Sequence, residues 1–154
     1  MKQTVFALLS AAALVSAASP SFAQDATELL RSDLRANKTA ILTSAMELDP
    51  TQSEAFWPIY REYEAELIKL NDESLAMIKD YAANYSTMTD EMAKDLLKRG
   101  FSVRESRTKL LKTYAGKVEK ALSPKIAARW VQCELAIQAV IDVQMGSELP
   151  LMKK

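Results

Sequence analysis

Apolar residues recur along the chain at alternating spacings of three and four, which is the period of one face of an α-helix. The pattern is clearest in residues 50–84, where it runs through Phe56, Tyr60, Tyr63, Leu67, Leu70, Ser74, Met77 and Tyr81. These positions form a heptad-like seam that only Ser74 interrupts. The spacing predicts a helix of about 35 residues, hence roughly 50 Å long.

Two of the predicted helices begin with the same short motif. Asp49 precedes Pro50, and Ser123 precedes Pro124. Asp and Ser are good N-cap residues, and proline suits the first turn of a helix, where its missing N–H leaves no bond unmade. Gln52 stands three residues after Asp49, which predicts a capping box. The second and fourth helices are therefore expected to start at Pro50 and Pro124.

The first and third helices have weaker patterns. The first is expected from about Asp25 to Met46. Its apolar side is formed by Leu30, Leu34, Ile41 and Ala45. The third extends to about Ala121. Its apolar positions are Met92, Leu96, Val103, Leu110, Tyr114 and Val118. Gly100 and Arg107 lie near the same face and weaken this stripe.

Residues that favour turns mark where the helices end. Asn84 can take the left-handed conformation that closes a helix, and Thr87 or Thr89 can cap the next one. Gly146 is expected to end the fourth helix, and Pro150 prevents any continuation.

Charge favours pairing of the two long helices. Residues 50–84 hold seven acids and three bases, and residues 90–121 hold five acids and nine bases, so their net charges are −4 and +4. Opposite charges favour an antiparallel hairpin of these two helices. The alternative is that the charges lie on two solvent-exposed faces that differ in sign without contacting each other. The sequence thus predicts an all-α fold: an elongated antiparallel helical hairpin with two shorter flanking helices.

The N-terminal residues have the layout of a secretory signal peptide. Lys2 is followed by a short apolar run and then by "SFA" at residues 21–23, a small-x-Ala cleavage site. The run is too short to span a membrane comfortably, and an N-terminal anchor is the alternative. We therefore expect residues 1–23 to be a signal peptide, and residues 24–154 to be a single exported domain without stable membrane insertion.

Composition argues against catalysis and nucleic-acid binding. The 20 bases balance the 20 acids, so there is no excess of positive charge for nucleic acid. The chain has no histidine, and it lacks a Gly-rich phosphate loop or a Ser or Cys nucleophile with a plausible partner. We expect a protein that is not an enzyme and that has no cofactor.

The single cysteine and a group of methionines are the remaining chemical candidates. Cys133 lies on an apolar stripe formed by Ile126, Trp130, Cys133, Ile137 and Val140. This placement favours a buried thiol over an intermolecular bridge. Met88 and Met92, one helical turn apart, could offer thioethers to Cu(I), together with Met77. Packing is the favoured interpretation of these methionines, so no metal site is expected.

Aromatic residues gather near the starts of the second and fourth helices. They are Phe56, Trp57, Tyr60, Tyr63 and Trp130. They are candidates either for binding a client or partner or for packing against one another. Pro58 lies inside the second helix and predicts a kink. We favour a bend that wraps this helix around the fourth over one that grips a ligand.

The two helix-start motifs resemble those of a known family. Leu48-Asp49-Pro50-Thr51-Gln52 and Leu122-Ser123-Pro124-Lys125-Ile126 stand 74 residues apart. They resemble the paired LTxxQ motifs of Spy/CpxP-like periplasmic helical proteins, with Asp49 and Ser123 in place of threonine and Ile126 in place of glutamine. A closer likeness is to exported bacterial proteins with "FWP-x-Y" and a terminal "E-[IL]-P-L", matched here by residues 56–60 and 148–151.

That resemblance implies an elongated helical hairpin, usually dimeric, with an envelope-stress role. The role would be ATP-independent chaperoning of unfolded proteins, or inhibition of a sensor. Some relatives sense metals through histidine-rich sites, which this chain lacks. The resemblance therefore leads us to expect a periplasmic, non-enzymatic, chaperone-like protein that binds unfolded or envelope proteins. The alternatives are a dedicated structural or regulatory partner of one envelope protein and a metal-responsive protein.

A homodimer is also expected from helix lengths. A helix of roughly 50 Å has more apolar stripe than flanking helices of roughly 30 Å can cover. The seam from Tyr63 to Tyr81 would then stay partly exposed, and a twofold partner is the commonest way to cover such a stripe. The competing interpretation leaves this stripe open as the client-binding surface.

Overall fold

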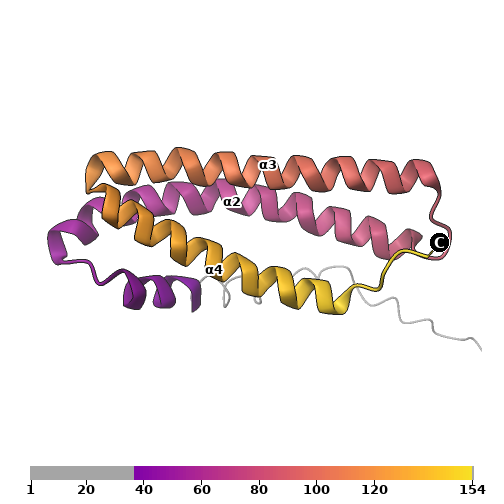
Figure 1. Cartoon of the computed structure of the whole chain (residues 1–154), viewed down its shortest axis with the longest axis horizontal. Coiled ribbons are helices and arrows are strands. Elements are labelled where there is room, and N and C mark those ends of the chain that lie inside the picture. The colour runs from indigo at the N-terminus through magenta and orange to yellow at the C-terminus, as the bar shows by residue number, and fades with distance from the viewer. Residues whose placement is uncertain (1–36, 154) are drawn as a thin grey trace, which may run out of the picture. The chain divides into compact units, whose positions relative to one another are not determined.

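The computed structural model describes residues 37–153, and these residues are helical without any strand (Figure 1). Their four helices are a segment at 37–46, α2 (Pro50–Asn84), α3 (Asp90–Ala121) and α4 (Pro124–Glu148). The predicted all-α fold with four helices is confirmed. The signal peptide and the part of the first helix before residue 37 lie outside the described residues. From Lys38 onward the chain forms one compact unit.

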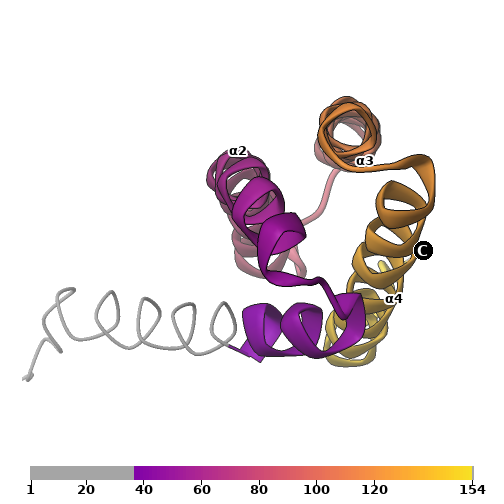
Figure 2. The ribbon, with the colours of Figure 1, turned by 90° about the vertical axis from the view of Figure 1, so that its left-hand side faces the viewer.

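Helices α2 and α3 run antiparallel as a hairpin, and α4 turns back along α3 (Figure 1). Seen end-on, α2, α3, α4 and the segment 37–46 surround a common core (Figure 2). Two ion pairs join the oppositely charged helices of the hairpin: Arg99 with Asp80 at 2.7 Å, and Lys117 with Glu62 at 2.8 Å. Both pairs are exposed and contribute little each, so apolar packing carries most of the stability.

The helix starts have the caps that the sequence predicts. The Asp49 carboxylate accepts from the Gln52 backbone N–H at 2.8 Å, and the Gln52 amide oxygen accepts from the Asp49 N–H at 3.2 Å. This is a complete capping box. Ser123 caps α4 through the Ile126 N–H at 3.2 Å. Of the two threonines considered for α3, Thr89 is the N-cap.

Two helices do not end in the way that the sequence predicts. Asn84 has no left-handed backbone, and its side-chain amide instead donates to the Asp80 carbonyl at 2.9 Å. Gly146 does not end α4, which continues through it to Glu148. The helix stops where Leu149 becomes extended (φ −96°, ψ 120°), because the residue before Pro150 is disfavoured in the α region.

The inner face of the segment 37–46 also differs from the prediction. Leu42 and Met46 are buried, whereas Ile41 is 52% exposed. Lys38, Leu42 and Met46 follow one another at intervals of four, so they share a face one position away from the predicted one. The segment ends in Glu47, whose φ of 49° is the only positive non-glycine φ in residues 37–153. This residue turns the chain toward α2.

Polar residues that interrupt the apolar faces of α2 and α3 are hydrogen-bonded to one another across the hairpin. Arg107 of α3 donates to Asn71 at 2.6 Å and to Ser74 at 3.3 Å on α2. Ser74 in turn donates to the Leu70 carbonyl at 3.0 Å. Burial lowers the pKa of the Arg107 guanidinium, while the charge of Asp142 opposes this shift. The polar seam positions are thus hydrogen-bonded to one another between the helices.

The C-terminal segment is held beside the end of α2. Tyr81 Oη donates to the Pro150 carbonyl at 2.7 Å, and Tyr85 Oη donates to the Leu151 carbonyl at 3.0 Å. These bonds fix the "LPL" residues near the hairpin turn. None of the helices in the described part of the chain is long and apolar enough to cross a membrane.

Candidate functional site

The structure brings four of the five candidate aromatic residues into one core. Phe56, Tyr60, Tyr63 and Trp130 are each at most 3% exposed, and Trp57 packs at their edge. The ring centroids of Tyr63 and Trp130 lie 5.0 Å apart at 88°, and those of Phe56 and Trp130 lie 6.0 Å apart at 81°. Edge-to-face contacts of this kind stabilise a core beyond the area they bury. In this conformation these rings face one another rather than a ligand.

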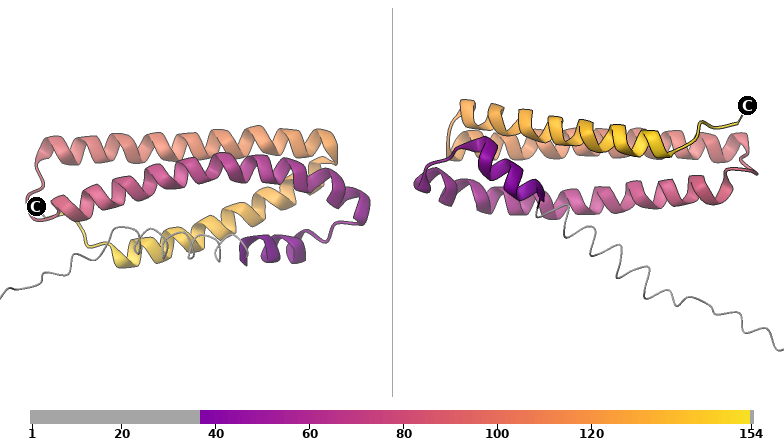
Figure 3. Two further views of the ribbon diagram at one scale, coloured as in Figure 1. Left: turned by 180° about the vertical axis from the view of Figure 1, so that it is seen from behind. Right: turned by 90° about the horizontal axis from the view of Figure 1, so that it is seen from below.

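A buried carboxylate on α4 lies against this aromatic core. Glu134 is 5% exposed, and its Oε2 accepts from Lys38 Nζ at 2.9 Å and from Tyr63 Oη at 3.1 Å. The Lys38 ammonium also stands 5.7 Å and 5.6 Å from the ring centroids of Tyr60 and Tyr63. The segment 37–46 lies between α2 and α4, so Lys38 reaches both helices (Figure 3, right). The cluster therefore ties three helices together.

Several polar atoms of this cluster are buried without a hydrogen bond. They are Tyr60 Oη, Trp130 Nε1, one oxygen of Glu64 and Oε1 of Glu134. Burial raises the pKa of both Tyr60 and Tyr63, and the charge of Glu134 raises both further. Glu64 also stands close enough to raise the pKa of Tyr60, although the two make no hydrogen bond of good geometry. Both phenols are therefore held neutral.

Sequence reasoning missed Glu134 and Lys38. Glu134 follows Trp130 by four residues and precedes Ile137 by three, so it lies on the apolar stripe of α4. An acidic residue on an apolar stripe was the signal in the sequence that could have predicted a buried charge. The neighbouring Cys133 is a half-buried free thiol that packs against the core. Val140 was predicted to belong to the same apolar stripe, but it is 59% exposed, so the buried part of the stripe ends before it.

The second half of α4 forms an open apolar surface. Every residue from 139 to 147 is exposed. Four of them are large and apolar: Val140 (59%), Ile141 (40%), Val143 (72%) and Met145 (39%). Asp142 is the single charged residue of this stretch. A helix that is apolar on all sides is normally buried, so this exposure indicates a surface that contacts something else. Residues 139–147 are called the open end of α4 below.

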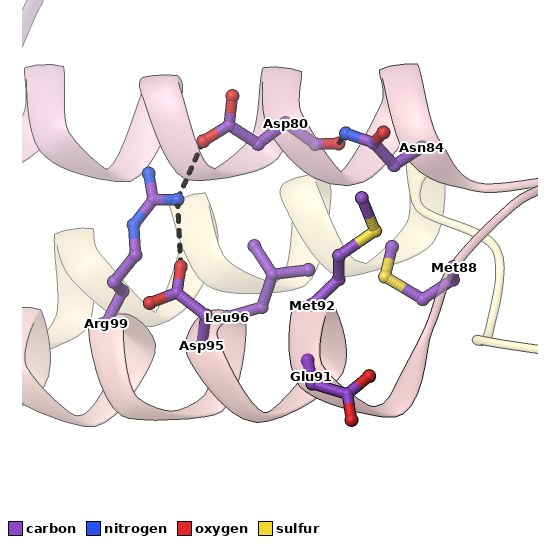
Figure 4. A pocket seen from close by; sticks show the side chains of 8 residues that line it. All are labelled: Asp80, Asn84, Met88, Glu91, Met92, Asp95, Leu96 and Arg99. Atoms are coloured by element: carbon purple, nitrogen blue, oxygen red, sulfur yellow. Dashed lines mark hydrogen bonds and ion pairs between the residues drawn. The ribbon is translucent and has the colours of Figure 1, made fainter.

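A shallow hollow of about 350 Å³ lies near the hairpin turn and is lined by both candidate thioethers, Met88 and Met92 (Figure 4). Met77 does not line it and instead lies beside Gly100. Asp80 and Asp95 both point to Arg99 and accept hydrogen bonds from its guanidinium, which neutralises their negative charge. Within residues 37–153, no group of three or more His, Cys, Asp or Glu side chains could hold a metal ion. Two thioethers alone are a poor site, so this hollow carries no metal assignment.

Comparison of the chain with protein-family models, with curated proteins and with solved structures finds no match. The function must therefore be argued from the surfaces described above.

Proposed function

We propose that the protein is a non-enzymatic, chaperone-like binding protein of the periplasm that holds apolar segments of unfolded envelope proteins. The observation that carries the proposal is the open end of α4, with four exposed large apolar side chains and one acid in nine residues. The signal-peptide layout of residues 1–23 supports the location. The likeness of the paired helix-start motifs to Spy/CpxP-like proteins supports the class.

The chemistry of this surface fits clients that differ in sequence. Apolar contact is non-directional, so it selects for exposed hydrophobic residues rather than for one particular partner. The flexible side chain of Met145 can adapt to different shapes, as in other promiscuous binding surfaces. Asp142 is the only charge on this surface, so the surface adds little repulsion against clients of either sign.

An aggregation-suppression assay with several unrelated unfolding clients tests this proposal. The chain from Gln24 onward should suppress aggregation of each client, and Val140→Ser/Val143→Ser should lose most of this activity. Leu97→Ser/Phe101→Ser on α3 is a matched control, since both of its residues are 63% exposed and large. Equal suppression by the α4 variant and the parent would contradict the proposal.

A dedicated partner of one envelope protein is the second candidate function. In that case suppression should be confined to one client, and other clients should aggregate at the same rate with and without the protein. The test thus separates a general binding surface from a specific one, because the same α4 substitutions are compared across clients.

A second copy of the chain is the competing occupant of this surface. The seam on which a homodimer was expected is half-buried from Leu70 to Tyr81, so it offers less apolar surface than the open end of α4. Light scattering across a dilution series distinguishes the two. A monomer at all concentrations supports the client surface, whereas a dimer that Val140→Ser/Val143→Ser dissociates assigns the surface to a second copy.

A further inference from the structure

Only some of the positively charged residues of helix α3 interact with α2. Three of its bases face α2: Arg99 and Lys117 make the two ion pairs of the hairpin, and Arg107 bonds Asn71. Six others are exposed and make no ion pair within residues 37–153. They are Lys94, Lys98, Arg104, Lys109, Lys112 and Lys120. The positive surplus of α3 is therefore displayed on its outer side rather than neutralised in the hairpin.

Two large apolar side chains project among these bases. Leu97 and Phe101 are each 63% exposed and lie one helical turn apart. On the face of α3 that also carries the exposed acid Glu105, five residues follow spacings of three and four. They are Lys94, Leu97, Lys98, Phe101 and Arg104. We call these five residues the basic-apolar face. Exposed Phe and Leu are costly in water, and their combination with Lys and Arg is typical of helices that lie on a membrane surface.

The basic-apolar face is a ridge rather than a groove. Seen end-on, α3 lies at the edge of the bundle with α2 and α4 on its inner side (Figure 2). Two hollows next to α3 are lined by its residues Leu96, Arg99, Ser102 and Val103, among others, and by none of the five residues of this face. A ridge suits a flat, deformable surface, whereas a bound peptide is normally received in a groove.

We propose that the basic-apolar face binds the surface of anionic phospholipid membranes. Leu97 and Phe101 enter the boundary between headgroups and acyl chains, while Lys94, Lys98 and Arg104 lie among the lipid phosphates. Lys109 and Lys112 extend the attraction along the helix by charge complementarity. The helix stays in the plane of the interface, in keeping with the absence of a spanning helix from the described residues. This leaves the open end of α4 free for clients.

Vesicle co-sedimentation tests this inference, with phosphatidylglycerol–phosphatidylcholine vesicles compared with phosphatidylcholine alone. The full chain and the form beginning at Gln24 are measured in parallel, so that the N-terminal apolar run is controlled for. Lys94→Gln/Lys98→Gln/Arg104→Gln should weaken partitioning onto anionic vesicles on the order of a hundredfold, since each base near the surface contributes separately. Leu97→Ser/Phe101→Ser should weaken it about tenfold or more.

The matched control is Arg61→Gln/Lys79→Gln/Lys125→Gln, which removes the same charge from exposed positions on α2 and α4. It should keep partitioning within about threefold, because charges beyond a Debye length are screened. Three results would overturn the proposal: equal loss in the control, binding that ignores lipid charge, or binding that requires residues before Gln24. Capture of an acidic unfolded protein, lost in the Lys/Arg variant without any vesicle binding, would assign the face to protein instead.

Discussion

Lys38 and Glu134 are 96 residues apart in the chain and form an ion pair of 2.9 Å, with side-chain exposures of 14% and 5%. The pair joins the first described helical segment to α4, and Tyr63 of α2 completes it through the same carboxylate oxygen. A buried pair of this kind stabilises only while both partners are present, because each neutralises a charge that has lost its water.

Removing one partner should therefore be costly. Lys38→Met leaves the Glu134 charge buried and unpaired, and we expect a loss of about 3–5 kcal/mol in the free energy of unfolding. Lys38→Met/Glu134→Leu should recover most of that loss. Urea unfolding followed by circular dichroism gives the coupling through a double-mutant cycle. Lys69→Met is the control, since its exposed bond to Glu66 should be worth less than about 1 kcal/mol. Equal losses at Lys38 and Lys69 would contradict this account.

The two core tyrosines should respond oppositely to loss of their hydroxyl groups. Tyr63→Phe removes the hydrogen bond to the Glu134 carboxylate, and a bond to a charged group is worth about 1.5–3 kcal/mol. Tyr60→Phe removes a buried hydroxyl that has no partner, so stability should stay unchanged or rise. Both variants keep the aromatic ring, so each is a packing control for the other. A larger loss for Tyr60→Phe would show that its hydroxyl has a partner, for instance a bound water.

Stability should fall at alkaline pH. Burial raises the pKa of Tyr60 and Tyr63 above the ordinary value of about 10, so in the unfolded state both lose their protons first. The unfolded state then binds fewer protons than the native state, and the free energy of unfolding decreases as pH rises above about 10. Each tyrosine contributes a slope of up to ~1.4 kcal/mol per pH unit, and none below its unfolded pKa. Unfolding curves between neutral and strongly alkaline pH should show a shallower fall in Tyr60→Phe than in the parent.

Replacing Pro58 with alanine should stabilise α2. Pro58 lies within the helix and is exposed, so alanine restores a backbone donor toward the Glu54 carbonyl without removing a core contact. We expect a gain on the order of 1–3 kcal/mol and a straighter helix axis in a variant structure. A loss of stability would mean that the proline bend is needed to seat Phe56 and Trp57. An unchanged axis would show that the proline does not cause a bend.

Most of the helical architecture could be predicted from local sequence. The starts of α2 and α4 depend on Asp49 and Ser123, whose side chains bond backbone groups only three residues away. The long seam of α2 is similarly local, because helical period alone places Phe56, Tyr60 and Tyr63 on one face. Capping and periodicity act within a few residues, so they can be read without knowing what the helix packs against.

The features that define the candidate surfaces were decided by tertiary structure. Glu134 and Lys38 look like ordinary surface charges until α2, α4 and the segment 37–46 enclose them in a shared core. The same apolar pattern continues along α4 past Ile137, yet Val140 and Val143 are exposed because no other described helix covers that end. An apolar stripe specifies only that a helix has a face to bury. Whether that face is covered depends on the length and direction of its neighbours, which are set by the packing of the whole unit.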